Sequence, residues 1–214
     1  MKTLTVTRYV RPLREGGSLP AIVEASDDGL YVAKFRGAGQ GRKALVAELV
    51  VGALGRALEL PVPELVLLDL DPSFGRNEPH DEIRDLLNAS SGLNVGLDYL
   101  PGSITFDPLV PGALTGALAS RVVAFDALTM NVDRTAKNPN LLSWHKQLFL
   151  IDHGAALYFH HGWANPDEAA RSPFAPIRQH VLLPFAVATW PTESIGLRPW
   201  LAGAALGVVC TGLG

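Results

Sequence analysis

The polar run NVDRTAKNPN occupies residues 131–140 and separates two segments of different character. Residues 114–130 before it are mostly apolar and predict a helix. Residues 141–144 and 147–151 after it are rich in apolar and β-favouring side chains, and they predict a β-hairpin. The polar run is therefore expected to form a loop that leads from a helix into a hairpin.

Three oxygen-bearing side chains frame this loop and hairpin. Asp133 and Asn138 stand five residues apart in the loop, and Asp152 follows the hairpin with Gly154 close behind it. Phosphoryl transfer requires a carboxylate that orients or deprotonates the attacking hydroxyl group, and oxygen ligands for the hard cation Mg²⁺. Because a hairpin returns the chain on itself, Asn138 and Asp152 are expected to converge on one magnesium site. The alternative is that Asp133 and Asn138 are only turn residues.

A lysine and a glutamate further upstream predict a phosphate-binding pair. Lys34 lies in a β-type run, where its ammonium group is costly unless it has a partner. Glu48 is the only acidic residue in the apolar segment 42–58, which predicts a largely buried helix. Kinases pair a strand lysine with a helix glutamate to position the phosphates of ATP. An exposed edge-strand lysine and a surface glutamate are the alternatives.

The remaining segments alternate between β-type and helical patterns. Gly16, Gly17 and Ser18 form a turn sequence, and its backbone, free of bulky side chains, is expected to approach phosphates closely. The alternative is a plain hairpin turn. In the helix before the polar run, Val122, Phe125 and Leu128 are expected on one face. The other expected strands are 4–9, 21–24, 30–35, 62–70 and 95–100, and a short helix is expected at 81–87.

The order of these features is similar to that of the protein kinase-like superfamily. More closely, NVDRTAKN at 131–138 and LIDHGAA at 150–156 resemble the HipA-like kinase family, and the resemblance runs from about Thr5 to His180. It implies an α+β, two-lobed protein kinase-like fold. The N-lobe, residues 1–100, would be a small antiparallel sheet with one helix, and the C-lobe, residues 101–214, would be mainly helical and shortened.

The resemblance also implies a role for each matching residue. Asp133 matches the catalytic aspartate, and Asn138 and Asp152 match the two Mg²⁺ ligands. Lys34 matches the phosphate lysine that pairs with Glu48. The implied cofactors are ATP and Mg²⁺.

Further ATP and phosphoryl contacts are expected around these residues. Lys137 is expected to touch the transferred phosphoryl group. Asp98, Tyr99 and Leu100 fall where the hinge between the lobes should lie, so their backbone would face adenine.

Two positions depart from the pattern of typical protein kinases. Asn131 stands two residues before Asp133, where those kinases have a histidine, and His153 replaces the phenylalanine of their Asp-Phe-Gly motif. Both changes are compatible with an atypical kinase and argue against regulation in the manner of protein kinases.

Composition narrows the other possibilities. A hydrophobic content of 48% is enough for a core, and a formal net charge of -3 gives no overall basic surface for nucleic acid. A single cysteine, Cys210, and the lack of a signal-like or membrane-spanning apolar run predict a cytoplasmic protein without membrane association. His153, His160 and His161 lack the spacing of zinc ligands, which argues against a zinc site. The sequence has no Gly-x-Ser-x-Gly motif, which argues against a serine hydrolase.

Three functions remain open from the sequence. The first is an ATP-dependent kinase that transfers phosphate to a hydroxyl group. The sequence does not identify the acceptor, which is either a protein serine or threonine or a small molecule, and it does not indicate the oligomeric state. The second is a nucleotide-binding pseudokinase with a sensing or scaffolding role, because residues 186–214 look like an atypical replacement for the family's C-terminal helices. The third is a partner-binding growth regulator related to bacterial HipA proteins.

Overall fold

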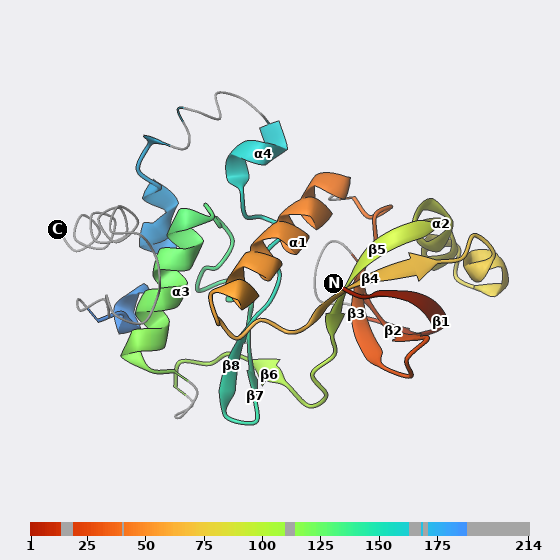
Figure 1. Cartoon of the computed structure of the whole chain (residues 1–214), viewed down its shortest axis with the longest axis horizontal. Coiled ribbons are helices and arrows are strands. Elements are labelled where there is room, and N and C mark those ends of the chain that lie inside the picture. Colours follow the sequence, from red (N-terminus) through yellow and green to blue (C-terminus); the bar gives the residue numbers. More distant parts are fainter. Residues whose placement is uncertain (14–18, 40, 110–113, 163–167, 169–170, 188–214) are drawn as a thin grey trace. The chain divides into compact units, whose positions relative to one another are not determined.

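The structure is a computed structural model that describes residues 1–13, 19–39, 41–109, 114–162, 168 and 171–187. The chain has a mixed α+β fold and divides into two compact units (Figure 1). The first unit comprises Met1–Val50 and Pro63–Pro101, and the second comprises Val51–Val62 and Gly102–Gly214. The assignment of separate functional roles to residues 1–100 and 101–214 stays a prediction.

Five strands of the first unit close into a barrel in the order β1-β2-β3-β5-β4 (Figure 1). The antiparallel pairing that the sequence predicts is present at β1–β2, β2–β3, β3–β5 and β4–β5. The closing pair, β1 with β4, is parallel, which differs from the expected antiparallel sheet. The bounds are β1 Thr3–Pro12, β2 Ala21–Ala25, β3 Leu30–Lys34, β4 Leu65–Leu70 and β5 Gly92–Asp98.

Helices cover the barrel on the sides where its strands carry apolar residues. Helix α2, Asp81–Ala89, adds Leu86 and Leu87 to the cluster that includes the barrel residues Val23 and Leu68. The first half of helix α1, Gly41–Ala57, packs Leu45 and Leu49 on a separate cluster formed by Leu65, Val95 and Leu97. A 3-10 turn, η1, spans Phe74–Asn77.

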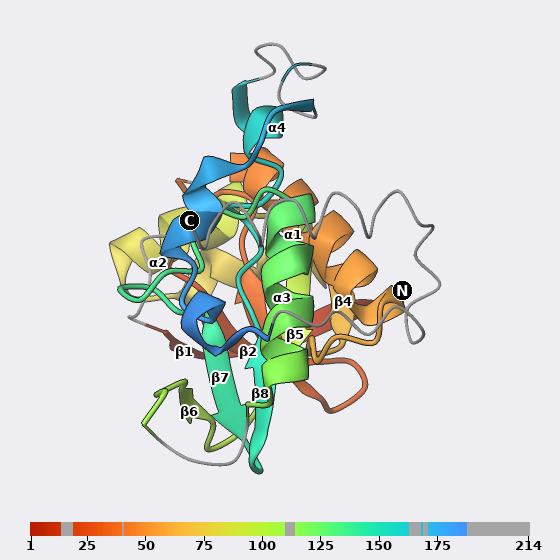
Figure 2. The same cartoon turned by 90° about the vertical axis from the view of Figure 1, so that its left-hand side faces the viewer.

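The second unit is built around helix α3, Gly116–Leu128, and a three-stranded sheet in the order β6-β7-β8 (Figure 2). Thr115 caps α3, because its side chain accepts a hydrogen bond from the backbone N–H of Leu118 at 3.2 Å. The remaining elements are β6 Ile104–Thr105, β7 Leu141–Trp144, β8 Gln147–Leu150, α4 Tyr158–Gly162, η2 Ala175–Gln179 and η3 Leu183–Phe185.

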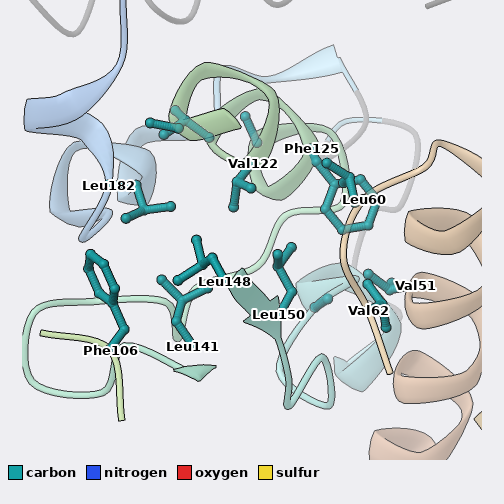
Figure 3. Packing of buried hydrophobic residues seen from close by; sticks show 14 of the residues in the cluster. Val51, Leu60, Val62, Phe106, Val122, Phe125, Leu141, Leu148, Leu150 and Leu182 are labelled. Carbon is teal, nitrogen blue, oxygen red and sulfur yellow. The ribbon is translucent and has the colours of Figure 1, made fainter. Parts of the chain in front are cut away.

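One hydrophobic cluster holds this unit together. Figure 3 shows Leu148 and Leu150 of the hairpin directed toward Val122 and Phe125 of α3. Leu182 joins the same cluster from the chain after η2. This cluster therefore holds together the hairpin and α3, the two elements that flank the loop at 131–140 in sequence.

Two expectations about helix faces are wrong. Leu128 is 48% exposed although Val122 and Phe125 are buried, because six residues at 100° each place Leu128 about 120° from Val122 around the helix. Helix α1 is not largely buried: Val46, Val50 and Leu54 are 45%, 51% and 38% exposed. Helix α1 therefore carries more apolar side chains than are buried in its packing contacts.

Candidate active site

The expected pair in the first unit is formed. The Lys34 Nζ lies 2.7 Å from Glu48 Oε2, and the Glu48 side chain is fully buried while that of Lys34 is 15% exposed. Strand β3 lies between β2 and β5, so Lys34 is not an edge-strand residue, and Glu48 is not a surface glutamate. The barrel and α1 thus hold an ammonium group and a carboxylate at a fixed separation, and their role toward phosphate stays a prediction.

The loop at 131–140 brings Asp133 and Asn138 together. Asn138 Nδ2 donates to Asp133 Oδ2 at 2.8 Å. A local turn supports this contact, because the Thr135 backbone N–H donates to the Asn138 carbonyl at 3.0 Å and the Thr135 hydroxyl accepts from the Asn138 N–H. The opposite amide orientation would set two oxygens against each other, so the Asn138 Oδ1 is the atom left for a cation.

Asp152 follows a short extension of the hairpin. The Ile151 N–H donates to the Asn140 carbonyl at 3.0 Å, which brings the end of the 131–140 loop beside the residue that precedes Asp152. Asp152 has φ 54°, in the left-handed region that Asp tolerates better than most residues. The amide oxygen of Asn138 and the carboxylate of Asp152 are hard oxygen donors, the type that Mg²⁺ prefers, and their convergence on one magnesium site stays a prediction.

A buried charged cluster lies beneath the loop. The Arg134 Nε donates to Asp126 Oδ2 at 2.6 Å, and His180 Nε2 lies 2.8 Å from the same oxygen. Asn131 Nδ2 donates to the other oxygen of Asp126 at 3.1 Å. Both members of the Arg134–Asp126 ion pair have fully buried side chains. These contacts join α3, the loop and the segment around residue 180.

The electrostatics of this cluster favour a charged Asp126. Burial raises the pKa of the Asp126 carboxyl group. The Arg134 guanidinium and the hydrogen bonds from His180 and Arg134 lower it by more than burial raises it, so the pKa falls to about 2. The carboxylate is therefore ionised at neutral pH, and the buried guanidinium keeps its counter-charge.

The same cluster explains both departures from the protein kinase pattern. Asn131 Oδ1 accepts from the Asp133 N–H at 3.1 Å while the Asn131 amide group donates to Asp126, so Asn131 joins the loop at 131–140 to α3. The His153 side chain is buried, and its Nδ1 lies 3.3 Å from Arg134 Nη2. The His153 ring also packs edge-on against the Phe125 ring. Both side chains thus serve packing and polar contacts within the second unit.

The other predicted site residues differ in how far the structure describes them. Lys137 is exposed in the loop. The backbone N–H groups of Asp98 and Tyr99 donate to the carbonyls of Glu64 and Leu30, at 2.8 and 3.0 Å. Those two N–H groups are thus used within the barrel unit. Leu100 is buried. Gly16, Gly17 and Ser18 lie outside the described residues, as does the tail from residue 188 onward.

Four residues of this site have no role assigned from the sequence: Asp126, Arg134, Asn140 and His180. For Asp126 a signal was present, because it is the only acidic residue between positions 114 and 130, as Glu48 is in its helix. Asn140 and His180 carry no such signal. Their contacts depend on the tertiary fold, with His180 lying 54 residues from Asp126 in sequence.

The described residues lack two features that would indicate a function of another kind. Within those ranges, no group of three or more His, Cys, Asp or Glu side chains is placed to hold a metal ion. Nor does any helix in the described part of the chain have the length and apolarity that a membrane crossing requires.

Comparison with known proteins identifies the family of the chain. Among curated proteins no match was found. The family model described as HipA-like kinase matches residues 6–181, which include most of the barrel, α3, the polar loop and the hairpin. The chain therefore belongs to the HipA-like kinase family.

Proposed function

We propose that the chain is an ATP- and magnesium-dependent kinase that transfers the γ-phosphoryl group of ATP to a hydroxyl acceptor. The observation that carries the proposal is the buried Lys34–Glu48 ion pair, with Nζ and Oε2 at 2.7 Å. This pairing must be in place for phosphoryl transfer in kinases, because it sets the lysine against the phosphates. Family membership supports a kinase-like function.

The second unit supplies the remaining chemical groups in this proposal. Asp133 accepts the proton of the acceptor hydroxyl while the oxygen of that hydroxyl forms a bond to the γ-phosphorus of ATP. The bond from that phosphorus to the β,γ-bridging oxygen breaks, and ADP leaves. Asn138 Oδ1 and Asp152 hold Mg²⁺, which neutralises phosphate charge when it is bound. Lys137, exposed beside Asn138, is proposed to contact the transferred group.

Adenine recognition is proposed for the segment from Asp98 to Leu100. Because the N–H groups of Asp98 and Tyr99 donate to Glu64 and Leu30, the Leu100 N–H is the proposed donor to adenine in this segment. Gly16, Gly17 and Ser18 are proposed to approach the phosphates.

Matched substitutions at the two acidic residues test the proposal. Mg-ATP is titrated against the wild type, Asp152→Asn and Asp133→Asn, and transfer of labelled γ-phosphate to protein, small alcohols, sugars, lipids and water is followed. Asp152→Asn is expected to weaken Mg-ATP binding at least tenfold, because it removes a metal ligand. Asp133→Asn is expected to keep binding and to slow transfer by about 10²–10⁴, the usual contribution of a general base.

The outcomes separate the proposal from its alternative. A wild type that binds no Mg-ATP contradicts the kinase assignment altogether. A wild type that binds Mg-ATP and transfers phosphate to none of these acceptors is the behaviour of a nucleotide-binding pseudokinase. Transfer that is unaffected by Asp133→Asn contradicts the role of Asp133.

A further inference from the structure

Asp133 is held by a second side chain in addition to Asn138. Asn140 Nδ2 lies 3.2 Å from Asp133 Oδ2 and 3.4 Å from the Asp133 carbonyl oxygen. With Asn138 Nδ2 at 2.8 Å, two amide groups donate to the same carboxylate oxygen. Within the described part of the chain, Oδ1 of Asp133 accepts no hydrogen bond from a neighbouring side chain or N–H group.

Asn140 is itself held in place by its backbone conformation, by hydrogen bonds to its carbonyl oxygen and by burial. It has φ 48°, a left-handed conformation that is uncommon for residues other than glycine and several-fold enriched in Asn. Its carbonyl oxygen accepts from the Ile151 N–H and from the Arg134 Nη1. The residue is buried, with 8% of its surface exposed. The buried ion pair of Arg134 with Asp126 therefore anchors the backbone of Asn140, and the Asn140 amide holds the Asp133 carboxylate.

We infer that Asn140 is a positioning residue for phosphoryl transfer: it occupies Oδ2 of Asp133 together with Asn138, so that Oδ1 is the oxygen that takes the proton of the acceptor hydroxyl. The inference rests on the proposed function. Asn138 has a second duty toward Mg²⁺ in that proposal, whereas Asn140 acts on Asp133 alone. Loss of the Asn140 amide thus affects the proton-accepting group without removing a metal ligand.

The left-handed backbone at residue 140 provides a clean variant. Asn140→Gly removes the amide and is free to keep φ 48°, whereas alanine would add backbone strain at the same place. Asn140→Asp keeps the shape but replaces the donor with a like charge beside Asp133. Lys146→Gly is the matched control, because Lys146 has φ 63° and is exposed at the hairpin turn away from the carboxylate contacts.

The experiment measures kcat and KM for Mg-ATP with labelled γ-phosphate, together with thermal unfolding, for the full chain and the three variants. Asn140→Gly is expected to lower kcat about 10- to 100-fold, which is less than the loss of the general base itself because Asp133 is still present, while KM for Mg-ATP changes less than threefold. Asn140→Asp should lower kcat at least as much, and Lys146→Gly should leave kcat unchanged.

Several results would overturn the inference. A kcat for Asn140→Gly equal to that of an active wild type overturns the positioning role alone. The same holds for activity that falls only in proportion to the folded fraction, or for a rise in KM with kcat kept. Absence of any transfer by the wild type overturns the proposed function, and the positioning role with it.

Discussion

At the scale of single residues, the Lys34–Glu48 pair combines a buried carboxylate with a cation on a neighbouring element. The Glu48 side chain has no exposed surface, so its negative charge has lost its hydration. Removing one partner of such a pair leaves a buried charge uncompensated, which is far more costly than replacing both partners with apolar groups. The pair is consequently a sensitive probe of how the first unit is built.

Lys34→Met is expected to destabilise the protein by about 3–5 kcal/mol, whereas the double variant Lys34→Met/Glu48→Met should recover a large part of that loss. Urea unfolding of the wild type, both single variants and the double variant gives the coupling energy directly. A coupling energy near zero, with the double variant as unstable as the sum of the singles, would contradict the buried ion pair.

At the scale of secondary-structure elements, helix α1 carries the clearest contrast between composition and packing. Val50 and Val51 are adjacent and chemically identical, yet Val50 is 51% exposed and Val51 is fully buried in the cluster that contains Val62 and Phe125. A helix turns about 100° per residue, so neighbouring side chains meet different surroundings. The apolar character of both was visible in the sequence, but their different burial was not.

This contrast gives a matched pair of substitutions. Val51→Ala is expected to lower the free energy of unfolding by about 1–3 kcal/mol, because it removes buried methyl groups and leaves a cavity. Val50→Ala should change it by less than about 0.5 kcal/mol or raise it slightly, since alanine favours the helix. Chemical denaturation of the two variants tests the assignment, and equal losses at both positions would contradict the faces of α1.

Local signals account for the elements that were predicted well. The hairpin of β7 and β8 and the strands β2 and β3 are bounded by turn residues close in sequence, and the structure confirms them. The two-residue strand β6 and the 3-10 turns have no sequence period long enough to detect. They form because the rest of the unit places them, which is why sequence patterns did not indicate them.

At the scale of the whole molecule, contacts between distant segments decide what could not be predicted. The parallel pairing of β1 with β4 closes the barrel across more than 60 positions of sequence, through pairs such as Thr3 with Leu67. The residues for the proposed chemistry were visible because their types and spacing carry a signal. The residues that hold them, Arg134, Asn140 and His180, depend on the complete fold of the second unit.

The Asp126 cluster connects this long-range structure to the stability of the chain in acid. The pKa of the Asp126 carboxyl group is about 2 in the folded protein and 3.8 for an unperturbed aspartate. Between these values the unfolded chain binds more protons than the folded one, so this stabilising contribution is complete above pH 4 and is lost as the pH falls toward 2. A shift of this size corresponds to about 2 kcal/mol.

Asp126→Asn is therefore expected to remove part of the acid sensitivity of the fold. The free energy of unfolding of the wild type should fall more steeply between pH 4 and pH 2 than that of the variant, and the two curves should draw together by about 2 kcal/mol over this range. Unfolding measured by denaturant at a series of pH values tests this, with Asp85→Asn at an exposed position of α2 as the control. Parallel curves for the wild type and Asp126→Asn would show that the pKa of the Asp126 carboxyl group is the same in the folded and the unfolded chain, which contradicts its stabilisation by Arg134 and His180.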